Sequence, residues 1–71
     1  MKDILVSWDQ FKAIVIGVKE LPVNCLESKD SYELFAVDGQ LFWKLILVKG
    51  SKEAEDFAKN HKKNCNKKAG H

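Results

Sequence analysis

The dipeptide Asp38-Gly39 constrains the fold of this chain more than any other feature. It separates two apolar, β-prone runs, 32–37 and 40–48. Asp-Gly suits the two-residue type I′ turn of a β-hairpin. Because side chains alternate across a strand, a hairpin centred there assigns each residue of both strands to one face of a sheet. The sequence therefore predicts an antiparallel hairpin with Asp38 and Gly39 in its turn.

The predicted register, in which Val37 opposes Gln40 and Leu34 opposes Trp43, separates an apolar face from a mixed one. The apolar face is predicted to face the core and comprises Tyr32, Leu34, Ala36, Leu41, Trp43, Leu45 and Leu47. The mixed face comprises Glu33, Phe35, Val37, Gln40, Phe42, Lys44, Ile46 and Val48. The candidate core residues are Tyr32, Leu34, Trp43, Leu45 and, from the segment that follows, Phe57.

The mixed face has two interpretations. In the first, a helix covers it and leaves Glu33 and Lys44 at the rim. In the second it stays open as an apolar patch, a feature that marks interaction sites. The candidate partner interface is then Phe35, Val37, Phe42, Lys44 and Ile46. A chain of 71 residues hides only about 60% of its unfolded surface, which favours self-association or docking on a partner.

The remaining segments complete a small α+β domain. Residues 4–6 and 23–27 are predicted strands, and Ser51 caps a helix over about 52–62 that is acidic early and basic late. Residues 7–20 form a helix, as a capping box at Ser7 and Gln10 indicates, or place a strand at 12–19, as a β-branched run with Gly17 indicates. We expect a small antiparallel sheet of about four strands with one or two short helices. The domain covers 1–66, and 67–71 form a basic flexible tail.

No constellation in the sequence predicts catalysis or a cofactor. His61 and Cys65 are four residues apart and could hold zinc with Cys25 or His71, but no second close ligand pair exists. A Cys-His nucleophilic pair lacks a residue that would orient the base. One disulfide between Cys25 and Cys65 stays open as an alternative. We therefore predict that the chain is not an enzyme and carries no metal.

The charge distribution places a basic stretch at the end of the chain. The formal net charge is +2, and no acid follows residue 58. The lysines that could contact nucleic-acid phosphates are Lys59, Lys62, Lys63, Lys67 and Lys68. The absence of arginine, which supplies bidentate base contacts, argues against this use. No apolar run is long enough to span a membrane, so the chain is predicted to be intracellular and soluble.

Two segments carry a resemblance to small phage and prophage proteins. They are the tyrosine-led strand Tyr32–Val37 with its Asp-Gly turn, and the run Asp56-Phe57-Ala58-Lys59-Asn60-His61-Lys62. The likeness covers roughly residues 32–66, with His61 where that pattern has an aromatic residue such as tyrosine. It implies a non-enzymatic virion structural or assembly protein of the capsid, neck or tail. Its partners would be other virion proteins or further copies of itself, in the virion and in the host cytoplasm during assembly. The alternative is a small phage or host regulatory protein that binds nucleic acid or inhibits a partner protein.

Overall fold

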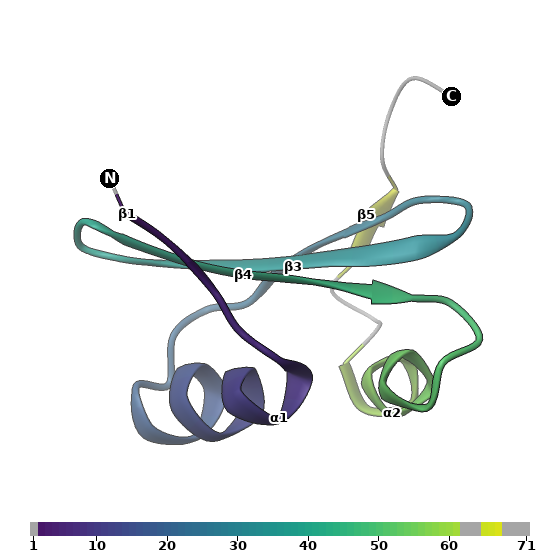
Figure 1. Cartoon of the computed structure of the whole chain (residues 1–71), viewed down its shortest axis with the longest axis horizontal. Coiled ribbons are helices and arrows are strands. Elements are labelled where there is room, and N and C mark those ends of the chain that lie inside the picture. Colours follow the sequence, from purple (N-terminus) through teal and green to yellow (C-terminus); the bar gives the residue numbers. More distant parts are fainter. Residues whose placement is uncertain (1, 62–64, 68–71) are drawn as a thin grey trace.

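The computed structural model describes residues 2–61 and 65–67, and it is an α+β fold as predicted. Five strands form one sheet in the order β1-β4-β3-β2-β5, and the helices lie together on one side of it (Figure 1). The strands are β1 (Lys2–Leu5), β2 (Asn24–Glu27), β3 (Ser31–Asp38), β4 (Leu41–Val48) and β5 (Cys65–Lys67). The helices are α1 (Trp8–Gln10), which continues as the π-helix η1 (Phe11–Val18), and α2 (Lys52–His61).

The sheet is mixed, whereas the sequence predicted antiparallel pairing throughout. Strands β2, β3 and β4 form the predicted antiparallel centre. Strand β1 joins β4 in parallel, and β5 joins β2 in parallel. Parallel strands are joined by long connections, so no local turn pattern in the sequence indicates that they pair. The last strand takes up Lys67, which was assigned to the tail, while residues 68–71 lie outside the described residues.

The central hairpin exists, but its turn is one residue further along than predicted. Asp38 pairs with Leu41, so the two-residue loop is Gly39-Gln40 and not Asp38-Gly39. Gly39 has a φ of 60° and Gln40 is not among the residues with positive φ. A type II′ turn needs positive φ only at its first central position, which explains glycine there. The strand partners shift by two residues, from Val37–Gln40 to Val37–Phe42, so every side chain keeps its predicted face.

Residues 7–20 are helical, as one of the two sequence interpretations predicted. The predicted capping box is present: the Ser7 hydroxyl accepts from the Gln10 backbone N–H, and the Gln10 side chain accepts from the Ser7 N–H. The β-branched run is accommodated by widening to a π-helix, in which the Lys19 N–H donates to the Ile14 carbonyl. Gly17 fits this geometry because a Cβ there would lie 3.2 Å from the Lys12 carbonyl oxygen.

The core lies between the helices and one face of the sheet. The aromatic rings of Trp8 and Tyr32 each contact Phe57, with centroids 5.6 and 5.3 Å apart. All five candidate core residues are buried, together with Phe11 and Val15 of η1. The buried set is Trp8, Phe11, Val15, Cys25, Tyr32, Leu34, Ala36, Trp43, Leu45, Leu47, Ala54 and Phe57. Because both helices cover this face, the mixed face has no helix over it within the described part of the chain (Figure 1).

Candidate protein-interaction face

The helix-free side of the sheet, called the open face below, is formed by residues of β1, β2, β3 and β4. The strand register places its residues side by side on this side of the sheet. They are Asp3, Leu5, Asn24, Leu26, Ser31, Glu33, Phe35, Val37, Phe42, Lys44, Ile46 and Val48. All five residues predicted as a candidate interface therefore lie on one continuous surface.

The open face exposes several large apolar side chains. Among the described residues, the exposed large hydrophobic side chains are Leu5, Val18, Val37, Ile46 and Val48, and four of these five lie on the open face. Ile46 and Val48 are 59% and 62% exposed. Their neighbours Leu45 and Leu47 on the same strand are each 5% exposed. An apolar surface that a monomer leaves in water is a typical interaction site.

Two stacked phenylalanines lie near the middle of the open face. The rings of Phe35 on β3 and Phe42 on β4 have centroids 5.5 Å apart and an interplanar angle of 16°. Both side chains are only half-buried. The pair is diagonal, because Phe35 opposes Lys44 and Phe42 opposes Val37. Aromatic anchors near the centre of a patch are the feature that most often dominates binding energy in protein interfaces.

Sequence reasoning missed the contribution of β1 to this face. Leu5 is 75% exposed and lies beside Lys44 because β1 pairs in parallel with β4. The parallel pairing leaves no local signal, so only the three-dimensional arrangement adds Leu5 to the patch. Val48 belonged to the predicted mixed face and extends the patch at the far end of β4.

The helix layer carries a polar cluster that joins the two helices. The Trp8 indole N–H donates to Asp56 Oδ2 at 2.8 Å, and Lys12 Nζ lies 3.1 Å from the same oxygen. The hydrogen bonds from Trp8 and then Lys12 lower the pKa of Asp56 below its usual value. The hydrogen bond to Asp56 raises the pKa of Lys12. A shallow cleft of about 410 Å³ lies beside this cluster. The paired charges fix one helix to the other and offer no poised acid or base.

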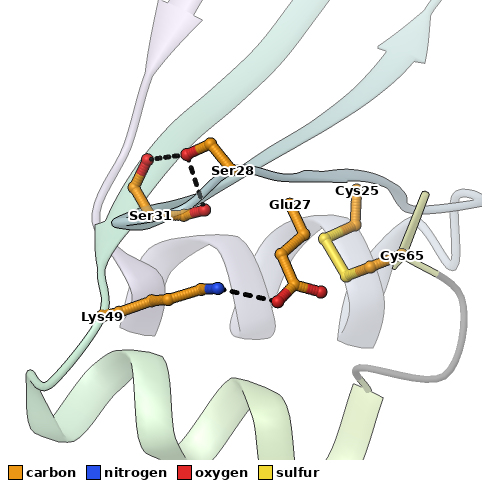
Figure 2. The surroundings of a disulfide bond; sticks show 6 residues. All are labelled: Cys25, Glu27, Ser28, Ser31, Lys49 and Cys65. Atoms are coloured by element: carbon orange, nitrogen blue, oxygen red, sulfur yellow. Dashed lines mark hydrogen bonds and ion pairs between the residues drawn. A yellow bond between two sulfur atoms is a disulfide. The ribbon is translucent and has the colours of Figure 1, made fainter. Parts of the chain in front are cut away.

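A disulfide joins β2 to β5, and an ion pair joins β2 to the residue that follows β4 (Figure 2). Cys25 on β2 is bonded to Cys65 on β5, so the alternative of one disulfide is the one the structure has. Lys49 Nζ lies 2.7 Å from Glu27 Oε2 and 5.1 Å from the centroid of the Tyr32 ring. The hydrogen bond to Glu27 raises the pKa of Lys49.

This arrangement bears on the zinc and nucleophile alternatives. Cys65 lies on a strand, so the helical spacing assumed for His61 and Cys65 is wrong. Both thiols are consumed in the disulfide. His61 ends α2 with its ring against Trp8 and Phe57. Within residues 2–61 and 65–67 no group of three His, Cys, Asp or Glu side chains is arranged to hold a metal, and His71 lies outside that part.

The basic residues are only partly placed by the structure. Lys59 is exposed on α2, and the backbone of Lys67 belongs to β5. Lys62, Lys63 and Lys68 lie outside the described residues. The open face itself carries Lys44 beside the acids Asp3 and Glu33. Within the part of the chain that the structure describes, no helix is long and apolar enough to cross a membrane.

Comparison with protein families, with curated proteins and with solved structures finds no match to this chain.

Proposed function

We propose that this chain is a non-enzymatic protein-interaction subunit that docks through its open face. One observation carries the proposal: both helices cover the same side of the sheet and leave an apolar, aromatic-centred surface on the other side. Burying such a surface against another protein removes about 25 cal/mol of unfavourable free energy per Å² of apolar area. A small domain with a limited core gains stability by such docking.

The setting that we propose is a phage virion, where the chain acts as a structural or assembly component of capsid, neck or tail. The resemblance of residues 32–66 to small phage proteins supports this setting. Particles are built from repeated subunits, and these need self-complementary or partner-complementary patches. The disulfide between Cys25 and Cys65 also suits a protein that works outside the reducing cytosol, as virion-surface proteins do.

The virion assignment is tested by mass spectrometry of purified particles made with the gene for this chain. The proposal expects the protein in stoichiometric amounts relative to the other structural proteins. Its absence from the particles would overturn the virion role. Binding to single-stranded DNA or RNA that falls steeply with added salt would favour the nucleic-acid alternative instead.

The docking face is tested by replacing one apolar residue on it and an exposed apolar residue elsewhere. Phe42→Asp places a charge in the stacked phenylalanine pair of the open face, and Val18→Asp places the same charge on an exposed apolar residue of the helix layer. We expect Phe42→Asp to abolish incorporation into particles while Val18→Asp incorporates normally, with both variants folded by circular dichroism. Equal incorporation of the two variants would show that the open face is not the docking surface.

A further inference from the structure

The open face carries Lys44 and two acids, Asp3 and Glu33, beside its stacked phenylalanines. Glu33 on β3 opposes Ile46, and Lys44 on β4 opposes Phe35, so the two charged residues lie on a diagonal of the same face. A two-fold axis that bisects this diagonal, in the plane between two stacked sheets, brings Lys44 of one copy to Glu33 of the other. The operation is reciprocal, so each dimer makes this contact twice.

We propose that the occupant of the open face is a second copy of this chain, docked sheet against sheet with reciprocal Glu33–Lys44 contacts. This inference rests on the proposed function, because it names the partner of the same surface. Two identical sheets stack with their apolar side chains interdigitated about 10 Å apart, as in β-sandwiches. The apolar side chains of both copies then form one shared layer.

The outline of the sheet sets the scale of such a dimer. In Figure 1 the sheet runs along the longest extent of the molecule, 30 Å, and the helices are stacked beneath it along the 26 Å extent, so the other direction of the sheet follows the shortest extent, 19 Å. A stable interface buries roughly 600–1,000 Å² per partner, so nearly the whole open face takes part in the dimer. The distribution of residue types is that of an interface, with the stacked Phe35 and Phe42 inside and Asp3 and Asn24 towards its edges.

The charge complementarity favours a copy of the same chain over an unrelated apolar partner. A wholly apolar partner would desolvate Lys44 without supplying an opposite charge, which is costly. A second copy supplies a carboxylate, its own Glu33, at the required place. Glu33 also interacts within its own chain, and a carboxylate can accept more than one hydrogen bond. None of the salt bridges among the described residues involves Lys44.

Charge reversal tests this pairing directly by sedimentation velocity over a concentration series. The wild type is expected to be dimeric at submillimolar concentration. Lys44→Glu and Glu33→Lys should each weaken self-association about tenfold or more, because each creates two like-charge contacts per dimer. An equimolar mixture of the two single variants should recover the dimer, since the heterodimer restores both opposite-charge contacts. The double variant E33K/K44E should recover it as well.

The mixture separates contacts between copies from those within one copy, because mixing changes nothing inside either chain. Lys52→Glu reverses an exposed charge on the helix layer and should leave the dimer unchanged. Near-ultraviolet circular dichroism of each variant verifies the fold. A monomeric wild type, or a mixture as weak as the single variants, would overturn the dimer with reciprocal charges. The proposed function fails separately, when Phe42→Asp enters particles as well as Val18→Asp does.

Discussion

The two faces of the central hairpin are made by the same strands, but one is buried in the core and the other is exposed. Trp43 and Phe42 are neighbours in sequence, yet Trp43 lies in the core and Phe42 lies on the open face. The same alternation separates Leu45 and Leu47 from Ile46 and Val48. Both faces are rich in apolar residues, so hydrophobicity alone does not decide which one the chain buries itself.

The placement of the helices explains why one face of the hairpin is buried and the other is not. Residues 2–61 and 65–67 contain two helical segments, and the Trp8–Asp56 hydrogen bond joins them side by side on one face. Ring contacts from Trp8 and Tyr32 to Phe57 complete that layer. No third helix within the described residues remains for the other face. A small chain that builds five strands and one helical layer therefore exposes an apolar surface, and we interpret that surface as the working part of the molecule.

The largest contrast is expected from truncating neighbouring aromatic residues. Trp43→Ala should lower the free energy of unfolding by about 3–5 kcal/mol, as large core truncations do. Phe42→Ala should cost less in the monomer, because its side chain is only partly buried. Urea denaturation followed by far-ultraviolet circular dichroism measures both. Equal losses would mean that the two faces do not differ in burial.

Trp43→Phe sharpens the same comparison. The buried Trp43 indole N–H has no hydrogen-bond partner within the described residues. Replacement by phenylalanine therefore removes no hydrogen bond and keeps an aromatic ring in the core. We expect a clearly smaller loss than for Trp43→Ala in the same denaturation series. A loss as large as that of alanine would show that the indole N–H is bonded in solution.

The disulfide is expected to give the next largest effect. Cys25 and Cys65 are 40 residues apart, and a bridge closing a loop of this length stabilises by about 4 kcal/mol in the chain-entropy account. The double variant C25S/C65S should lose roughly 2–4 kcal/mol. Because Cys25 pairs with Leu34 on the core side of the sheet, self-association through the open face should persist in the folded fraction. Unchanged stability on reduction would show that the bridge contributes nothing to the fold.

The smallest effect is expected from Asp56, at the surface junction of the two helices. Its pKa is lowered in the folded state, so its contribution is present above its usual pKa of 3.8 and is lost as the pH falls through the lower folded value. Asp56→Asn should reduce stability at neutral pH and flatten the loss of stability in acid. Asp9→Asn is the matched control, because Asp9 is 92% exposed and lies 3.7 Å from Lys12. Thermal melts from pH 7 to pH 2 measure both. Identical acid profiles for Asp56→Asn and the wild type would contradict the pairing.

The sequence predicted the faces better than the turn that defines them. Successive side chains along a strand point to opposite faces of the sheet. A two-residue shift in pairing therefore left Phe35, Phe42 and Ile46 on the predicted side. The turn itself was misplaced, because Asp-Gly favours one hairpin loop whereas Gly39-Gln40 satisfies another with a single positive φ. The helix over 52–61 was predicted closely, since its cap and charge distribution are local signals.

Non-local features could not be predicted in the same way. Leu5 reaches the open face only because β1 pairs with β4 in parallel, across a long connection. The pairing of β5 with β2 depends on Cys65 meeting Cys25, and both cysteines are isolated in sequence. The contact between the two helical segments is also non-local, because Asp56 meets Trp8 and Lys12, 48 and 44 residues away. Each of these contacts joins segments that carry no local signal of one another.

The central claim is that one face is closed within the chain and the other is completed by a partner. Methyl NMR spectra of the wild type over a concentration series test it most directly. The account predicts that the signals of Ile46 and Val48 shift as dimers form, while those of Leu45 and Leu47 stay in place. Shifts of equal size for all four residues, or no shifts while the protein self-associates, would contradict it.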